Sequence, residues 1–414
     1  MPHDESPTEP FDQPTEQTDT EHTSSEGPSF GEGGPVLEAG TQVGGYTVDR
    51  LLGQGGMGAV YLAEQDRPQR KVALKLMRPG LASAEALRRF EHEAELLGRL
   101  QHPGVAQIHE AGLHEGAPFF AMEFVDGLTL TAYANRHALS VSARLKLFTR
   151  VCEAVHHAHT KGVIHRDLKP ANILVTEVGE PPEAPPKVLD FGVARATDAD
   201  VQAATMRTDV GQLIGTIPYM SPEQVGGVPG DLDTRSDVYA LGVVLYELLV
   251  GRLPYDLKDR LILEAARVIR EEDPTRLSSL DTRLRGDVET IVGKALEKER
   301  DRRYQSALDL GSDIRRYLSD EPIAARPVST WYQVRKFSKR NTALVAGVGV
   351  AFGALGVGLV GTTYGLVEAN AQRELADARA VEAEEARESA EAARAEEAER
   401  AGEVEKVAAF QSSM

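Results

Sequence analysis

The residues best suited to chemistry lie in two short segments near the middle of the chain. Residues 165–172 read His-Arg-Asp-Leu-Lys-Pro-Ala-Asn, and residues 190–192 read Asp-Phe-Gly. Together they supply an acid that can orient a hydroxyl, a lysine that can balance charge, and the amide and carboxylate oxygens that Mg²⁺ binds. This set of groups favours phosphoryl transfer from a nucleotide to a hydroxyl.

A glycine-rich segment and a lysine lie upstream of these two segments. Residues 53–58 read Gly-Gln-Gly-Gly-Met-Gly, and residues 72–75 read Val-Ala-Leu-Lys. Glycine lets a backbone approach a triphosphate closely. Taken alone, the glycine pattern could be a Rossmann turn or an ordinary tight turn, but the Rossmann form needs a helix next, and residues 59–63 are typical of a strand. A P-loop is not supported, because the chain contains no G-x-x-x-x-G-K-[ST] motif.

In this order and spacing the four segments match the signature motifs of protein kinases. Over roughly residues 46–318 the chain resembles the serine/threonine protein kinases, most closely the bacterial eukaryotic-like (Hanks-type) receptor kinases. The resemblance implies an α+β, bilobal fold with a small β-rich lobe, a larger helical lobe and a nucleotide cleft between them. It also implies ATP and Mg²⁺ as cofactors and protein substrates with serine or threonine, a choice that Lys169 and Thr216 favour over tyrosine. The alternatives are a pseudokinase-type signalling scaffold, which predicts a missing catalytic residue, and a ligand-sensing membrane receptor.

The resemblance implies a role for each polar residue of the motifs. Asp167 would orient the substrate hydroxyl, Lys169 would stabilise charge on the transferring phosphoryl group, and Lys75 would contact the α- and β-phosphates. The Mg²⁺ ligands would be Asn172 and Asp190.

Lys75 is expected to pair with a glutamate of the helix that follows it. Glu93 is preferred over Glu91 and Glu95, because residues 89–94 match the family pattern Arg-Phe-x-x-Glu-Ala. The residues expected to bind ATP lie in the glycine-rich segment, on the next strands, in the hinge between the lobes (residues 122–125) and below the adenine: Leu52, Gly53, Gln54, Gly55, Gly56, Met57, Gly58, Val60, Ala73, Lys75, Met122, Glu123, Val125 and Leu174.

Three further features follow from the resemblance. Glu223 and Arg303 are expected to form a buried ion pair, and Asp237 is expected to anchor the catalytic segment. The loop between Asp190 and Glu223 would be an activation loop, in which Thr205 and Thr208 are the favoured autophosphorylation sites and Arg166 would pair with the phosphorylated loop.

Charge and composition divide the chain. The net charge is −18, but residues 1–49 contain no Lys or Arg, and the segment after residue 368 is dominated by Glu, which argues against nucleic-acid binding. We expect an acidic disordered tail at 1–43 without a signal peptide, and a protein kinase domain at 44–318.

The single cysteine, Cys152, lies in an apolar pattern and is expected to be a core residue.

Residues 342–367 carry no charge and are long enough to cross a bilayer as one helix. Four basic residues lie in the linker at 319–341 just before this span, whereas Glu368 is the first charge after it, so the positive-inside rule places the kinase domain in the cytoplasm. We therefore expect a single-pass protein of the cell membrane. The pairs Gly349/Gly353 and Gly361/Gly365 permit a homodimer.

The final segment, residues 368–414, is rich in Ala, Glu and Arg and favours a helix. Its apolar stripe is mostly Ala, so a solvated extracytoplasmic stalk is preferred over a dimerising coiled coil. We expect no sensory domain in this segment.

Overall fold

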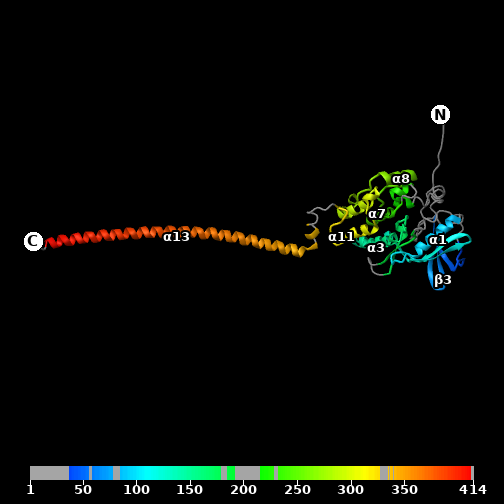
Figure 1. The fold of residues 1–414 in the computed structure, drawn as a ribbon, viewed down its shortest axis with the longest axis horizontal. Helices are drawn as coiled ribbons and strands as arrows, with labels where there is room; N and C mark the ends of the chain where they lie inside the picture. Colours follow the sequence, from blue (N-terminus) through cyan, green and yellow to red (C-terminus); the bar gives the residue numbers. More distant parts are fainter. Residues whose placement is uncertain are drawn as a thin grey trace, which may run out of the picture. The chain divides into compact units, whose positions relative to one another are not determined.

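The computed structural model describes residues 37–55, 58–77, 84–178, 184–191, 215–227, 232–326 and 334–411, the last range without residues 335 and 339. The chain divides into two compact units, Met1–Pro327 and Val328–Met414. Figure 1 shows the first unit in blue to yellow and the second as a long orange-to-red helix.

The first unit begins with an antiparallel sheet whose strand order is β1-β2-β3-β4-β6-β5. Its strands are β1 (Gln42–Val43), β2 (Tyr46–Gly55), β3 (Gly58–Asp66), β4 (Gln69–Met77), β5 (Ile108–His114) and β6 (Ala117–Glu123). Helix α1 (Ala84–Gly98) lies between β4 and β5 in the chain, as its apolar spacing predicted. These elements form the small lobe.

Successive side chains of a strand point to opposite faces of the sheet, and the apolar residues of the small lobe therefore fall into two hydrophobic clusters. Tyr61, Leu74 and Ala121 belong to an outer cluster that contains only residues of this lobe. Their neighbours Phe120 and Met122 belong to the main cluster, where the Phe120 ring lies 4.7 Å from that of Phe90 on α1. The main cluster continues without a break into the helical lobe, so the two lobes share one apolar interior.

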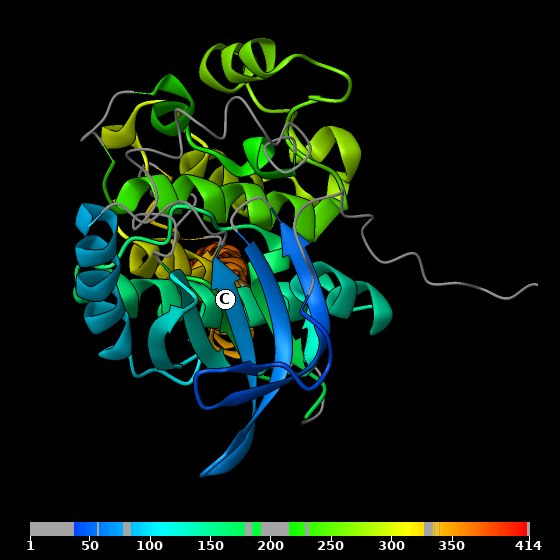
Figure 2. The same ribbon diagram turned by 90° about the vertical axis from the view of Figure 1, so that its right-hand side faces the viewer.

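The larger lobe is mainly helical, and Figure 2 shows its green and yellow helices beside the blue strands. Its longer helices are α3 (Val141–Thr160), α7 (Thr234–Val250), α8 (Ile262–Glu271), α10 (Asp287–Ala295) and α11 (Ala307–Leu318). Shorter elements are α2 (Leu130–Arg136), α6 (Pro222–Gly226), α9 (Leu277–Leu280), η1 (Pro170–Asn172), η2 (Ile217–Tyr219), η3 (Thr282–Leu284) and η4 (Arg300–Arg302). A small sheet joins β7 (Gly127–Thr129), β8 (Ile173–Thr176) and β9 (Pro186–Val188).

Helix α7 is the centre of this lobe. Most of its residues are buried, Asp233 caps its start by accepting a hydrogen bond from the Arg235 N–H, and Gly251 ends it in the left-handed conformation. The predicted pair of Glu223 and Arg303 is confirmed beside it, with two N–O distances of 2.7 and 2.8 Å. Arg303 is fully buried and also donates hydrogen bonds to three backbone carbonyls. The ion pair and these bonds together compensate for the burial of its charge. Cys152 is buried in the core, as predicted.

The described chain continues to pack against α11 beyond residue 318. Asp313 accepts hydrogen bonds from the backbone N–H groups of Ala324 and Ala325 at 2.6 and 2.8 Å, and Ile323 is buried. Buried carboxylates need such partners, so these bonds fasten residues 319–326 to the lobe.

The second unit is dominated by α13 (Thr342–Gln411). In the described part of the chain, this is the one helix that is long and apolar enough to cross a membrane, judged by length and composition alone. The helix includes both the predicted span at 342–367 and most of the predicted helical segment at 368–414.

Candidate active site

The segment 165–172 follows α3 and ends in η1, and a buried carboxylate holds it in place. Asp237 of α7 accepts hydrogen bonds from the backbone N–H groups of His165 and Arg166 at 2.7 and 2.8 Å and from His159 Nε2 at 2.7 Å. Burial raises the pKa of Asp237, but these partners outweigh burial and keep that pKa below its ordinary value. Arg166 has a φ of +67°, an unfavourable conformation for a residue with a side chain. The predicted anchor is therefore present, and it stabilises a strained backbone.

His165 connects this segment to the strand before Asp190. Its Nε2 lies 2.8 Å from the carbonyl oxygen of Leu189, and its Nδ1 lies 3.3 Å from the backbone N–H of Asp167. A carbonyl only accepts and an amide N–H only donates, so the proton is on Nε2. The ring also contacts buried Phe191, with centroids 4.7 Å apart. His165 thus fixes the spacing between the two halves of the site.

Asp167 and Lys169 form an ion pair, and Lys169 also donates a hydrogen bond to Thr216. Lys169 Nζ lies 3.0 Å from Asp167 Oδ2 and donates to Thr216 Oγ1 at 2.9 Å. The other carboxylate oxygen, Asp167 Oδ1, is buried and has no hydrogen-bond partner among the described residues. One oxygen of the acid is therefore available to accept a proton from a substrate hydroxyl.

Asn172 and Asp190 present the two oxygens expected to bind Mg²⁺. Asn172 Nδ2 donates to the backbone oxygen of Asp167 at 2.7 Å and to its Oδ2 at 3.2 Å, which leaves the amide oxygen of Asn172 for another partner. Burial raises the pKa of Asp190, but Lys75, His165 and Lys169 outweigh burial and keep the carboxyl group ionised. The described residues contain no group of three or more acidic, His or Cys side chains suited to a metal. An Mg²⁺ ion at this site would therefore need phosphate and water oxygens as well, which is typical of this ion.

Lys75 contacts Asp190 in this structure. Its Nζ lies 2.9 Å from Asp190 Oδ2, and the lysine side chain is about nine-tenths buried. The predicted partner, Glu93, lies in α1, but its side chain is outside the described residues, so that pair stays a prediction. Asp190 has a φ of +56°, and buried Phe191 follows it.

The strand register places several of the predicted ATP-binding residues on the inner face of the sheet. Val60 lies opposite Lys75 in the β3/β4 pair, and Ala73 lies opposite Met122 in the β4/β6 pair. Leu174 lies on β8 of the helical lobe. The other predicted residues lie on β2 (Leu52, Gly53, Gln54, Gly55), at the start of β3 (Gly58), and at or just after the end of β6 (Glu123, Val125). Gly56 and Met57 lie outside the described residues, as do Thr205 and Thr208.

Gly58 has a steric role in addition to the predicted contact with ATP, which stays a prediction. Its φ is +149°, and a Cβ at this position would collide with the carbonyl oxygen of Leu76 on the paired strand. Gly58 is therefore needed for close pairing of β3 with β4, quite apart from any phosphate.

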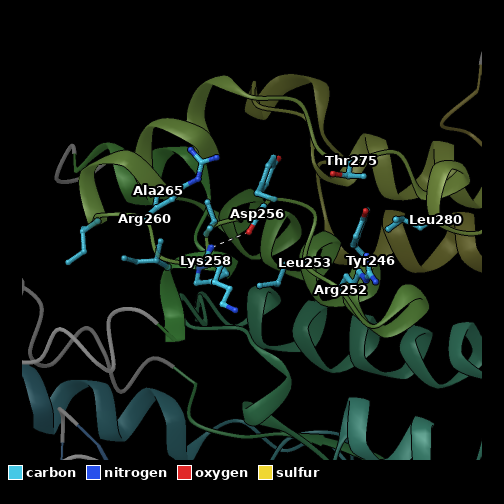
Figure 3. Close-up of a pocket in the computed structure, with 14 residues that line it drawn as sticks. Tyr246, Arg252, Leu253, Asp256, Lys258, Arg260, Ala265, Thr275 and Leu280 are labelled. Carbon is cyan, nitrogen blue, oxygen red and sulfur yellow. Dashed lines mark hydrogen bonds between the residues drawn. The ribbon is translucent and has the colours of Figure 1, made fainter. Parts of the chain in front are cut away.

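Two cavities adjoin these residues. A small one of about 10 Å³ lies behind Met122 and is lined by Asp190, Phe191 and apolar side chains. The larger one, of about 590 Å³, is bordered by Ile217 and Pro218, directly after Thr216, and by residues that follow α7 and begin α8. Figure 3 shows Tyr246, Leu253 and Lys258 around it. The sequence did not indicate this cavity, because its lining is scattered between residues 217 and 280 and forms no motif.

Comparison with known proteins agrees with this geometry. Residues 46–310 match the family model described as protein kinase domain. PknB of Mycobacterium tuberculosis, a serine/threonine-protein kinase, is 36% identical over 291 residues, which cover 69% of this chain and 45% of that protein. PrkC of Bacillus subtilis, also a serine/threonine-protein kinase, is 36% identical over 274 residues, covering 66% of this chain and 40% of that protein. The chain thus spans about half the length, or less, of these curated relatives.

A likeness to solved structures confirms the predicted fold. The crystal structure of the Mycobacterium tuberculosis PknI kinase domain has a TM-score of 0.52 and 29% identity, with 68% of this chain and 99% of that chain covered. The small β-rich lobe and larger helical lobe are those of the protein kinase fold. Motifs, geometry and comparisons agree, and this chain belongs to the protein kinase family, with similarity to the bacterial serine/threonine kinases.

Proposed function

We propose that this chain is an ATP- and Mg²⁺-dependent serine/threonine protein kinase. The observation that carries the proposal is the buried Asp167 Oδ1, which has no partner among the described residues and lies beside an oxygen that is paired with Lys169. A serine or threonine hydroxyl at this oxygen would be oriented for attack and would give up its proton to Asp167. Lys169, held between Asp167 and Thr216, would supply positive charge where negative charge develops on the phosphoryl group.

The cofactors are supported by the chemistry of the donor set. Bound ATP would supply the γ-phosphoryl group, with its charge offset by Mg²⁺. Asn172 and Asp190 would hold the metal through one amide oxygen and one carboxylate. Lys75 contacts Asp190 and would exchange that partner for phosphate oxygens and Glu93 when nucleotide binds. The inner face of the sheet, with Val60 and Ala73, would cover the adenine.

We further propose that the kinase is anchored in the cell membrane by one helix, with its catalytic domain in the cytoplasm. The support is the apolar first part of α13 and the basic residues that precede it. Protein substrates would be met on the cytoplasmic side, and the glycine pairs of the span would allow a homodimer.

The test is a kinase assay on the full chain in lipid nanodiscs with labelled ATP and Mg²⁺. We expect label on the chain itself or on a generic protein substrate, and no label with Asp167→Asn. Asp301→Asn is the matched control, because the same change is made at an exposed ion pair of the same lobe. Phosphosite mapping would show whether Thr205 and Thr208 are modified. Folded protein that binds ATP but transfers no phosphate would favour a pseudokinase scaffold instead.

A further inference from the structure

A basic cavity of about 840 Å³ borders the hinge at Glu123 and Phe124. We call it the rear cavity. It is bordered by the start of β4, the segment between α1 and β5, and the hinge, and its charged or titratable lining residues are Arg70, Lys71, His102, His109, Glu123 and Lys187. None of these was assigned a chemical role by the motifs, apart from the backbone of Glu123.

Two positive charges of this cavity, Arg70 and Lys71, form no ion pair with a described residue. Lys187 is paired with Glu123, with an N–O distance of 2.7 Å. Arg70 donates to the neutral side chain of Gln65 at 2.6 Å, and Lys71 is exposed; neither forms an ion pair with a described carboxylate. Burial lowers the pKa of both histidines, so they are neutral at pH 7. The cavity therefore favours an anionic ligand with at least two negative groups.

The chain itself contains a segment of complementary charge. Residues 1–36 include nine Asp or Glu and no Lys or Arg. This segment joins the described structure at Leu37, whose backbone N–H donates to the Tyr61 hydroxyl at 3.1 Å and whose side chain packs on the outer cluster of the small lobe. The acidic segment is therefore tethered to the lobe that contributes Arg70 and Lys71 to the rear cavity.

The strand register and side-chain contacts link the outer cluster, on which Leu37 packs, to Arg70 of the rear cavity. Tyr46, another member of the outer cluster, lies opposite Gln65 in the β2/β3 pair, and Gln65 is the partner of Arg70. Glu26 lies 11 residues before Leu37. A random-coil chain of about 11 residues has a root-mean-square span of roughly 17–20 Å. A tether whose span matches the distance to its site gives an effective concentration in the millimolar range, so weak contacts suffice for binding.

We propose that the acidic N-terminal segment, residues 1–36, binds back into the rear cavity through carboxylates on Arg70 and Lys71. The cavity in Figure 3 is a weaker match, although Arg252, Lys258 and Arg260 border it. Arg260 is already paired with Glu264 at 3.0 Å, and Asp256 lies in the lining, so less charge is left for an acidic segment. Binding at the rear cavity would bring carboxylates next to the Lys187–Glu123 pair, directly behind the hinge.

The test is zero-length cross-linking of the full chain in nanodiscs with a water-soluble carbodiimide, which joins a lysine amine to a carboxylate in contact with it. Mass spectrometry of the monomeric product should find Lys71 joined to Asp or Glu of residues 1–36. The bond between Lys187 and Glu123 serves as an internal reference. Exposed Lys161 of the large lobe is the control amine, and Lys258 reports binding at the cavity of Figure 3.

A second arm keeps the cross-linking amine and changes only the charge beside it. Arg70→Gln should lower the yield of the Lys71 product several-fold, and so should a rise to 0.5 M salt, because exposed charges are screened. The matched change Arg283→Gln, at a side chain that is 81% exposed, should leave the yield unchanged. Equal yields at Lys71 and Lys161, a preference for Lys258, or no effect of Arg70→Gln would overturn the proposal. None of these readouts depends on kinase activity.

Discussion

Replacing Asp237 by Asn should both destabilise the large lobe and impair catalysis. Asp237 is 1% exposed, and its two carboxylate oxygens accept bonds from the backbone of His165 and Arg166 and from His159. Asparagine has one acceptor oxygen, and its NH₂ group would face a donor in the place of the other oxygen. At least one buried N–H would lose its partner, in a segment where Arg166 already has an unfavourable φ.

The magnitude follows from those contacts. A hydrogen bond to a charged group contributes about 1.5–3 kcal/mol, and a buried donor left unpaired costs about 1–3 kcal/mol. Since Asn retains part of the acceptor capacity, we expect the free energy of unfolding to fall by about 2–4 kcal/mol. Loss of the backbone bonds would also displace Asp167, so we expect kcat to fall by at least about 100-fold, because small errors in position are costly to catalysis.

The assay is urea denaturation followed by circular dichroism, together with initial rates on a protein substrate. Asp301→Asn is the matched control, since Asp301 pairs with Arg235 but its side chain is 93% exposed. It should change stability and rate little. If the two variants have unfolding midpoints that agree within error, or if Asp237→Asn keeps full kcat, Asp237 does not hold the catalytic segment in place.

Three further predictions concern other parts of the first unit. Lys75→Met should lower the phosphorylation rate by at least about 100-fold, as measured with labelled ATP, while Lys161→Met should not. Gly58→Ala should lower the thermal midpoint because its Cβ would collide with the backbone of β4, whereas Gly45→Ala, which has open space around it, should not; equal midpoints would contradict this. Burial lowers the pKa of Lys298 to about 8, so the unfolded chain binds more protons between about pH 8 and 10.5, and the free energy of unfolding should rise across that window. Lys298→Met should flatten this rise in urea titrations at a series of pH values.

Residues within one motif could be assigned from the sequence because the chemistry requires their types and their spacing. Asp167, Lys169 and Asn172 are neighbours in the chain and remain neighbours in space, linked by bonds of 2.7–3.2 Å. The period of two along β3, β4 and β6 likewise predicts which side chains share a face. Even the distant pair of Glu223 and Arg303 could be predicted, through family resemblance.

Contacts that depend on the relative placement of separate elements could not be read from the sequence. The bond between Lys75 and Asp190 joins residues 115 positions apart and depends on how the two lobes meet. The pair of Lys187 and Glu123 depends in the same way on a strand of the large lobe reaching the hinge. The steric role of Gly58 could not be read from the sequence for a related reason, because the collision that excludes a side chain comes from another strand.

The division of the small lobe between two hydrophobic clusters has a consequence for its opening motions. Strand β1 and the start of β2 contribute only to the outer cluster, so they can separate from the sheet without disturbing the helices. Strand β6 contributes Phe119 and Ala121 to one cluster and Phe120 and Met122 to the other. In amide hydrogen exchange, β6 should therefore exchange as slowly as α7, whereas β1 exchanges early. Strand β6, which ends in the hinge, would then couple local unfolding of one lobe to local unfolding of the other.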